Sequence, residues 1–398
     1  MAIKGKYTCI FGGGAVRGFT YIGAIKAMHD LDIDVDTLAG SSVGSLIAAL
    51  LAVGYSALEL KDLLFKVNFE LFKDIRLNQS KEFAISKGNV FTDWVRDIIA
   101  KKVYGDKYKK GKNKPVLFKD LPKNLVILTT DLNKFCSFEF SNMETPDFEV
   151  AEAVRISCSM PGLMTPVEYD GKKLVDGDLL KGIPLWKLSK NLSNTQNRIL
   201  EFRLEGDTVD KENNTFEFLN SIYSCMTCAS TDFIIDVFGQ NDKYDYVKIT
   251  TGDIIVVDFN MSDNMKNALI QKGYNDSIKY LAKDCVAKKI RISKFYDRMS
   301  DYVNEMIRFI KYNEVDKTKE KIKDLFLFMS DAYKYIDADI VEGLWTLKND
   351  VFAATLKKSW LRGEKFADRN SILNNAEIIK RVIDCKNDEL KDYILKVG

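Results

Sequence analysis

A serine in a short glycine-flanked segment carries the first sign of nucleophilic chemistry. Gly40-Ser-Ser-Val-Gly44 fits the pattern G-x-S-x-G, with Ser42 at its centre, and lies between a short β-rich run and an apolar helical run. In that context Gly40 and Gly44 permit a sharp turn, which lifts the serine hydroxyl above a sheet beside the following helix. The pattern therefore predicts a nucleophile elbow with Ser42 as the nucleophile.

A second glycine-rich segment, Gly12-Gly-Gly-Ala-Val-Arg-Gly18, also joins an expected strand to an expected helix. Such a turn exposes backbone N–H groups at a helix amino end, and these groups suit an anion. A dinucleotide site is the alternative, but its fingerprint needs an acidic residue at the end of the next strand. Asp34 and Asp36 precede that strand, Thr37–Gly40. We therefore favour an anion-stabilising loop.

Ser42 needs a base to become a nucleophile, and the only histidine in the chain is His29. It lies eleven positions after Gly18, which is roughly 16 Å along a helix at 1.5 Å per residue. We expect His29 on the helix surface, away from the loop. A carboxylate must replace it, and Asp176, directly after the β-like run Lys173–Val175, is the candidate. One histidine also excludes three-histidine and H-E-x-x-H metal sites in one subunit. Ester cleavage by an activated serine needs no metal, so none is expected.

The apolar periodicity predicts the elements that would hold these segments. In the first half of the chain β-rich and amphipathic runs alternate, which is typical of an α/β domain with a mostly parallel sheet. Strands are expected at residues 7–11, 37–40, 124–130, 135–140, 173–175, 199–204, 246–249 and 254–259, and helices at 19–30 and 45–53.

After about residue 283 the pattern becomes helical. One apolar stripe is formed by Val303, Met306, Ile307 and Ile310, and another by Ile322, Leu325, Phe326 and Met329. We therefore expect a catalytic α/β part at residues 1–282 and a helical region at residues 283–398. A packed structural bundle is the favoured interpretation of the helical region; a lid, a dimerisation element and a membrane-docking element are the alternatives.

Charge and hydropathy limit the partners. The chain has 59 Lys and Arg against 57 Asp and Glu, a net charge of +2, so nothing attracts it as a whole to a nucleic-acid polymer. Lys101–Lys114 is locally basic; we favour a solvated loop over a patch for anionic lipid head groups. The longest strongly apolar run, Leu46–Val53, is far shorter than the about 20 residues that cross a bilayer, and no signal peptide is recognisable. We expect a cytoplasmic protein that meets membranes peripherally.

In this order the glycine-rich loop, the G-S-S-V-G segment and Asp-Gly resemble the patatin-like phospholipases, lipid acyl hydrolases that use a Ser-Asp dyad. The similar segments are Phe11–Met28, Thr130–Leu132, Ala153–Leu163 and Leu174–Asp178. The resemblance covers roughly two-thirds of the chain and ends near Leu281. It implies the three-layer α/β/α fold of that family with a mostly parallel central sheet.

The resemblance also implies a role for each matching residue. Ser42 would attack an ester carbonyl while Asp176 takes its proton, and Arg17 would hold the loop or attract a phosphate. The oxyanion hole would be formed by backbone N–H groups around Gly13, Gly14 and Ala15. No cofactor is implied. A phospholipid membrane surface is the implied partner, whereas a protein or nucleotide activator and a homo-oligomer stay open.

Two residues depart from the family pattern. Ala15 stands where glycine is usual, and alanine keeps the N–H but resists a positive φ. Asp178 follows Gly177 where the family usually has glycine or alanine. We expect the Asp178 carboxylate to point to solvent; if it faced the site, it would raise the pKa of the base by like-charge repulsion.

The sequence thus predicts a serine lipid acyl hydrolase that cleaves fatty-acyl esters of phospholipids or lysophospholipids through an acyl-enzyme on Ser42. Two alternatives stay open. One is an acyltransferase that uses the same dyad. The other is a membrane-binding or interaction protein that has this fold and little activity.

Overall fold

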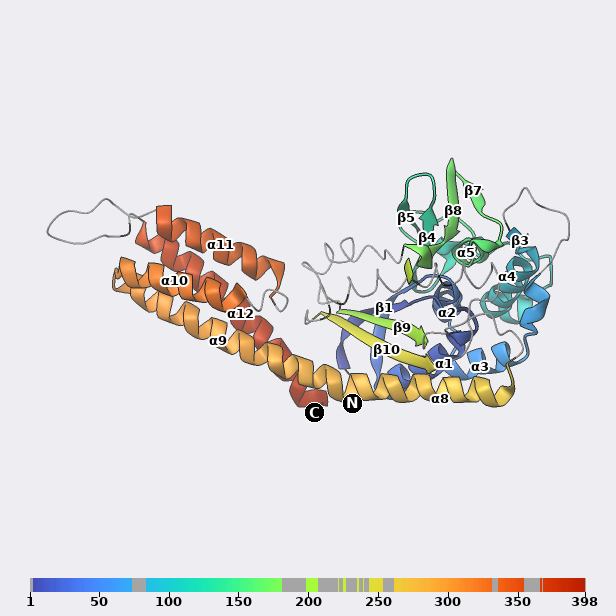
Figure 1. Ribbon diagram of the computed structural model, residues 1–398, viewed down its shortest axis with the longest axis horizontal. Coiled ribbons are helices and arrows are strands. Elements are labelled where there is room, and N and C mark those ends of the chain that lie inside the picture. The colour runs from blue at the N-terminus through green and yellow to red at the C-terminus, as the bar shows by residue number, and fades with distance from the viewer. Residues whose placement is uncertain are drawn as a thin grey trace.

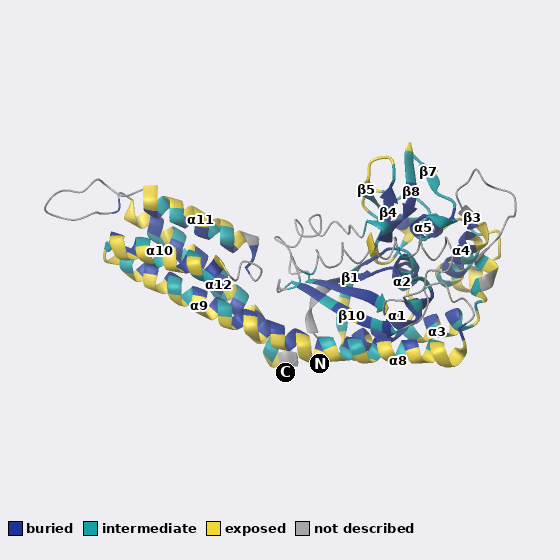
Figure 2. Cartoon of the chain, viewed as in Figure 1, coloured by how far each residue is buried: buried dark blue, intermediate teal, exposed yellow. Residues whose placement is uncertain are grey.

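An α/β part and a helical region follow one another along the longest axis of the molecule (Figure 1). The computed structural model describes residues 3–73, 84–180, 198–206, 243–252, 261–330, 336–353 and 368–397, together with residues 221, 225, 226, 235, 239 and 366. Each part has a large apolar core of its own, seen as buried inner faces in Figure 2.

A mostly parallel sheet forms the centre of the α/β part. Its strands are β1 (Ile3–Phe11), β2 (Ile33–Gly40), β4 (Asn124–Asp131), β5 (Cys136–Ser141), β7 (Val167–Tyr169), β8 (Lys172–Asp176), β9 (Arg198–Gly206) and β10 (Tyr244–Gly252). The order is β10-β9-β1-β2-β4-β8-β7, with β5 also paired to β4. Strands β10, β9, β1, β2 and β4 run parallel to one another, whereas β5, β7 and β8 pair antiparallel with their neighbours. Strands β3 (Ala84–Ser86) and β6 (Gly162–Met164) form a separate parallel pair.

Helices cover this sheet because its strands are apolar on both faces. Along β1, Cys9 and Phe11 enter the large core, whereas Ile10 belongs to a smaller cluster on the opposite face. The described helices of the α/β part are α1 (Phe19–Asp30), α2 (Val43–Ala52), α3 (Ala57–Phe65), α4 (Asn89–Tyr104), α5 (Val150–Ser157) and α8 (Asp263–Lys279). Short 3₁₀ turns cover Ala15–Gly18, Phe69–Lys73, Gly105–Lys107, Phe118–Asp120 and Gly177–Leu179.

Two glycines bring α1 and α8 into close contact. A Cβ on Gly23 would lie 1.9 Å from the carbonyl oxygen of Ile270, and a Cβ on Gly273 would lie 2.0 Å from that of Thr20. No larger residue fits at either position without moving a helix backbone. This packing fixes α8 against α1, the helix that follows the glycine-rich loop.

The helical region has four helices among the described residues. They are α9 (Cys285–Lys311), α10 (Val315–Ser330), α11 (Ala338–Ala353) and α12 (Arg369–Val397). The predicted stripes face its core: Val303 and Met306 are fully buried, as are Leu325 and Met329. Helix α8 continues through a π-helical turn, Tyr280–Asp284, into α9, so one long helix runs through both parts (Figure 1). The division at residues 282 and 283 stays a prediction.

The helical region joins the α/β part at the amino ends of the parallel strands. Tyr393 of α12 packs into the large core, and its hydroxyl lies 3.3 Å from the thiol of Cys285. At the start of β10 the carboxylate of Asp245 pairs with Lys289 at 3.6 Å and with Lys288 at 3.9 Å. The glycine-rich loop and the Ser42 segment follow the carboxyl ends of β1 and β2, at the opposite edge of the sheet.

The predicted elements agree well with the observed ones. The fold class, an α/β domain with a mostly parallel sheet and a helical carboxyl-terminal region, is confirmed. The helix expected at residues 45–53 begins earlier, at Val43. Lys101 and Lys102 belong to α4, so the expected basic loop begins after that helix. The strand expected at residues 254–259 lies outside the described residues. None of the described helices has both the length and the apolar character needed to cross a bilayer.

Candidate active site

The nucleophile elbow is a strained turn between β2 and α2. Ser42 has φ 51° and ψ −131°, a conformation that non-glycine residues rarely adopt and that costs of order 1–3 kcal/mol. Its flanking glycines are required by close contacts. A Cβ on Gly40 would lie 2.3 Å from the carbonyl oxygen of Gly44, and a Cβ on Gly44 would lie 2.0 Å from that of Phe11. The turn therefore packs directly against the end of β1.

The glycine-rich loop leaves β1 beside the elbow. Gly14 has φ 147° and Ala15 has φ 46°, so alanine adopts the positive φ that it resists. Among the described residues, the N–H groups of Gly14 and Ala15 have no hydrogen-bond acceptor, whereas the N–H of Gly13 donates to the carboxylate of Asp178 at 3.1 Å. Two of the three predicted oxyanion donors are thus available to a substrate.

Arg17 holds this loop. Its Nε donates to the carbonyl oxygen of Gly14 at 3.4 Å, and its Nη1 donates to Oγ1 of Thr251 at 3.5 Å. Tyr21 adds a second support because its buried hydroxyl donates to the carbonyl oxygen of Gly12 at 2.7 Å. Desolvation raises the pKa of Tyr21 well above its usual value, so the hydroxyl stays a donor. Of the two roles predicted for Arg17, these contacts agree with loop support.

Asp176 ends β8 and is buried, with 1% of its surface exposed. Its Oδ1 accepts the backbone N–H of Asp178 at 2.8 Å across the tight turn at Gly177. A Cβ on Gly177 would lie 2.2 Å from the carbonyl oxygen of Leu128, so this glycine lets the turn lie against β4.

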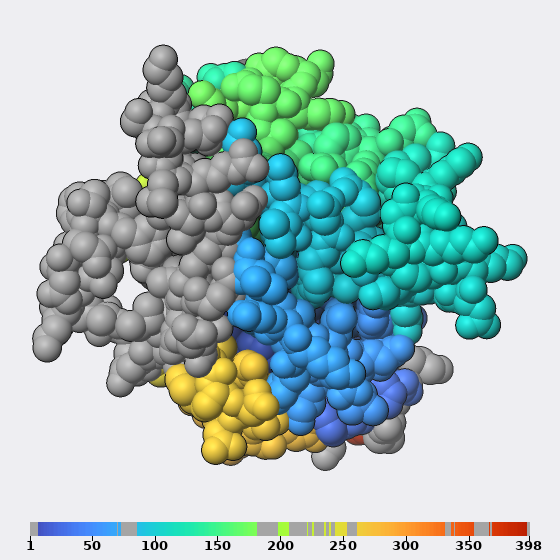
Figure 3. Space-filling model, turned by 90° about the vertical axis from the view of Figure 1, so that its right-hand side faces the viewer, coloured from blue at the N-terminus to red at the C-terminus, as the bar shows by residue number. Residues whose placement is uncertain are grey.

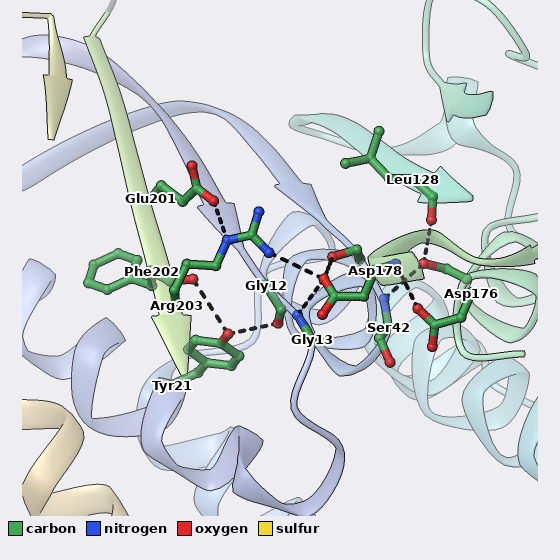
Figure 4. Close-up of polar contacts among 12 residues, drawn as sticks. Gly12, Gly13, Tyr21, Ser42, Leu128, Asp176, Asp178, Glu201, Phe202 and Arg203 are labelled. Carbon is green, nitrogen blue, oxygen red and sulfur yellow. Dashed lines mark hydrogen bonds and ion pairs between the residues drawn. The ribbon is translucent and has the colours of Figure 1, made fainter. Parts of the chain in front are cut away.

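The end of α5 brings Ser42 and Asp176 together. The hydroxyl of Ser157 accepts the N–H of Ser42 at 3.0 Å and donates to the carbonyl oxygen of Leu128 at 2.6 Å. Two residues later, the carbonyl oxygen of Ser159 accepts the N–H of Asp176 at 3.0 Å. In Figure 4 Ser42 lies between Asp178, on the side of Arg203, and Asp176. Ser157 was not predicted as a site residue, although it lies in Ala153–Leu163, one of the segments that resemble the family.

The expectation that Asp178 points to solvent is wrong. The residue is 5% exposed, and its Oδ1 accepts hydrogen bonds from Gly13 N–H, from the Ser41 hydroxyl at 2.7 Å and from Nη1 of Arg203 at 3.2 Å (Figure 4). The correction has a physical reason: a buried guanidinium, contributed by β9, supplies the positive charge that a buried carboxylate needs.

Arg203 was not predicted as a site residue. Its Nε also donates to Glu201, and the other oxygen of Glu201 accepts the Tyr244 hydroxyl at 2.7 Å. Burial alone would lower the pKa of Arg203, but the carboxylates of Glu201 and Asp178 outweigh it and raise that pKa. A signal was present in the sequence, since Glu201 and Arg203 are opposite charges two residues apart in an apolar strand and so share one face.

An apolar cavity of about 130 Å³ opens beside Ser42. Its lining includes Ala15, Leu46, Phe69, Phe72 and Phe91, and among the lining residues that the structure describes only Ser42 bears a hydroxyl. Desolvation, followed by the charge of Asp176, raises the pKa of the Cys158 thiol in the same wall, so Cys158 stays protonated. Helices α3 and α4, which contribute Leu64 and Phe91 to this lining, lie side by side on the face shown in Figure 3.

His29 takes no part in this site. It lies near the carboxyl end of α1, with 89% of its side chain exposed. The predicted position on the helix surface is confirmed.

Comparison with known proteins shows which proteins this chain is similar to. Residues 9–188 match the family model described as patatin-like phospholipase. The chain is 29% identical over 274 residues to the uncharacterized protein R571 of Acanthamoeba polyphaga mimivirus, covering 66% of this chain and 89% of that protein. It is 25% identical over 197 residues to the probable lipid hydrolase 463L of Invertebrate iridescent virus 6, covering 46% and 64%. The solved structure of VipD from Legionella pneumophila aligns with 94% of this chain and 91% of that one, at 14% identity and a TM-score of 0.49.

Proposed function

The chain belongs to the patatin-like phospholipase family through residues 9–188, and we propose that it is a serine lipid acyl hydrolase with Ser42 and Asp176 as its catalytic dyad. One observation carries the proposal: the strained serine of the elbow faces a cavity whose other described lining side chains are almost all apolar. A fatty-acyl chain suits such a cavity because it is apolar along its length, whereas its ester end needs a nucleophile. The proposed substrates are phospholipids and lysophospholipids.

In the proposed reaction Ser42 Oγ attacks the ester carbonyl and Asp176 accepts its proton. The carbonyl oxygen becomes an oxyanion, and the N–H groups of Gly14 and Ala15 stabilise it; one such donor is typically worth about 3–4 kcal/mol. Collapse expels the alcohol, which takes the proton from Asp176 and leaves an acyl-enzyme. Water then attacks this ester, Asp176 again moves the proton, and the free fatty acid leaves.

Substitution of the dyad tests the proposal. Ser42→Ala and Asp176→Asn are each expected to lower phospholipid hydrolysis at least about 1,000-fold, because nucleophile and base act as a unit. Fatty-acid release is measured on purified, folded protein. Ser330→Ala and Asp170→Asn, at exposed positions, are the matched controls and should keep wild-type activity.

Labelling by a fluorophosphonate probe separates the alternatives. Stoichiometric labelling that Ser42→Ala abolishes is expected for the hydrolase. If the wild-type protein is not labelled and releases no fatty acid in the presence of lipid, it is a binding protein and not a hydrolase. Acyl transfer to an added alcohol, in place of release, would make it an acyltransferase.

We further propose that the enzyme works at a phospholipid surface. The lysines after α4 are exposed, so a patch for anionic head groups stays open beside the favoured solvated loop: Lys107, Lys109, Lys110, Lys112 and Lys114. An activator and a homo-oligomer stay open.

A further inference from the structure

One buried carboxylate oxygen connects three segments of the site. Oδ1 of Asp178 accepts hydrogen bonds from the glycine-rich loop through Gly13 N–H, from the elbow through the Ser41 hydroxyl and from β9 through Arg203. A Cβ on Gly13 would lie 2.5 Å from Oδ2 of Asp178 and 3.1 Å from Cβ of Ser42. Carboxylate, loop and nucleophile are therefore in contact, and a shift of one moves the others.

These contacts decide which amides can serve an oxyanion. The N–H of Gly13 is used by Asp178, so it is not available to a substrate in this arrangement. The N–H groups of Gly14 and Ala15 follow it in the chain, and their distance from Ser42 depends on how Gly13 is held. Since Ser41 precedes the nucleophile, the same oxygen holds both sides of the reacting centre.

A carboxylate this close to a developing oxyanion would oppose the reaction unless its charge were offset. Arg203 offsets it. Its side chain is 3% exposed and lies against the glycine-rich loop, because a Cβ on Gly12 would lie 2.7 Å from Cδ of Arg203. Burial of this pair also excludes water that would otherwise compete for the Gly13 N–H.

We propose that Asp178 and Arg203 are positioning residues that clamp the glycine-rich loop to the nucleophile elbow, so that Gly14 and Ala15, and not Gly13, receive the oxyanion. The catalytic part of this inference rests on the proposed function; the clamp itself does not. Asp178 acts through the loop and the elbow and touches no reacting atom.

Three variants test the clamp through steady-state hydrolysis. Asp178→Ala should lower kcat about 100-fold with KM within about threefold, since a misplaced loop weakens the transition state more than substrate binding. Asp178→Asn keeps an oxygen that can accept the hydrogen bonds from Gly13 N–H and the Ser41 hydroxyl, and should stay within about tenfold of wild type. Asp178→Ala/Arg203→Met removes both charges and should remain about 100-fold impaired, because the acceptor is still missing.

Tyr244→Phe is the matched control. It removes a hydroxyl at the outer end of the same network, away from the loop, and should keep the wild-type kcat. The clamp would be overturned if the folded double variant, with a Tm near that of the wild type, had the wild-type kcat. It would also be overturned if Tyr244→Phe lost as much kcat as Asp178→Ala.

Hydrogen exchange separates the clamp from the proposed function. Amides of residues 12–18 should exchange faster in Asp178→Ala than in wild type or Tyr244→Phe, whether or not the protein hydrolyses lipid. Unchanged exchange there would show that the clamp is wrong. Faster exchange in a protein without esterase activity would instead retain the clamp and reject the hydrolase.

Discussion

At the scale of single residues, the site separates two carboxylates that are neighbours in the chain. The turn at Gly177 directs Asp176 toward the end of α5 and Asp178 toward Arg203. One carboxylate has a cation beside it and is already used as a hydrogen-bond acceptor by three groups. The other lies on the nucleophile's opposite side (Figure 4). Their surroundings thus suit Asp178 to the proposed structural task and Asp176 to the proposed proton transfer.

The strain at Ser42 predicts a gain in stability when the nucleophile is replaced by glycine. Glycine adopts φ 51° readily, whereas alanine keeps the strain. Ser42→Gly should therefore be about 1 kcal/mol more stable than Ser42→Ala in urea unfolding, with both variants inactive. The same pair at Ser371, exposed on α12, should show the opposite order because glycine weakens a helix. Equal stabilities at position 42 would contradict the strain.

Sequence reasoning found the two residues proposed for chemistry because each follows a strand in a recognisable motif. It placed Asp178 wrongly because the partners of that carboxylate, Ser41 and Arg203, lie 137 and 25 residues away in the chain. No local pattern reports such a contact. Charge alternation at Glu201 and Arg203 was the available hint of a buried pair.

At the scale of elements, the pairing of β1 with β2 assembles the site. Phe11 and Gly40, the last residues of these strands, are register partners, so the loop after one strand must lie beside the turn after the other. Parallel pairing was predictable from the alternation of strands and helices. The start of α2 at Val43, earlier than expected, was not predictable, because the side chain of Ser42 makes no capping hydrogen bond that would mark the helix start.

The close contact between α1 and α8 predicts a large effect of one methyl group. Gly23→Ala places a Cβ on the backbone of α8 and should cost about 3 kcal/mol in unfolding free energy. Because α1 follows the glycine-rich loop, kcat should fall as well. Gly343→Ala is the control: its Cβ would meet side-chain atoms of Ile379, the nearest being Cγ1 at 3.2 Å, and no backbone, so stability should change by no more than about 1 kcal/mol. Similar losses of stability in Gly23→Ala and Gly343→Ala would contradict the close packing of α1 against α8.

At the scale of the whole molecule, buried charges join the two parts. Burial alone would raise the pKa of Asp245, but Lys289 and Lys288 outweigh it and hold that pKa below its usual value of 3.8. The helical region thus meets the α/β part at the amino edge of the sheet, away from Ser42. This placement argues against a lid over Ser42, whereas a packed bundle, a dimerisation element and a membrane-docking element all stay predictions.

The Asp245 pairing predicts a pH-dependent contribution to stability. Because the folded pKa is lowered, the contribution is present above the unfolded pKa of 3.8 and is lost as pH falls below it. Asp245→Asn should cost about 3 kcal/mol at pH 7, since two buried lysines lose their partner. In urea unfolding the gap to wild type should narrow below about pH 4. Asp388→Asn, exposed on α12, should show no gap; a constant gap for Asp245→Asn would contradict the pairing.

The helical character of residues after 283 was predictable from apolar stripes, but their attachment was not. An apolar stripe indicates that one face of a helix is buried, but it does not indicate which element that face packs against. Tyr393 lies among the predicted helices, yet it belongs to the core of the α/β part. Its neighbours there, such as Cys285, come from a helix that begins more than a hundred residues earlier.

The return of Tyr393 to that core also constrains the order of events on the ribosome. About a hundred residues separate it from Val286, the preceding buried member of the same core among the described residues. At 5–20 residues per second, their synthesis takes about 5 to 20 s. Throughout that interval the nascent α/β part already contains Ser42 but lacks Tyr393, a residue of its core. The proposed hydrolase would therefore gain its full stability only after its helical region had been translated.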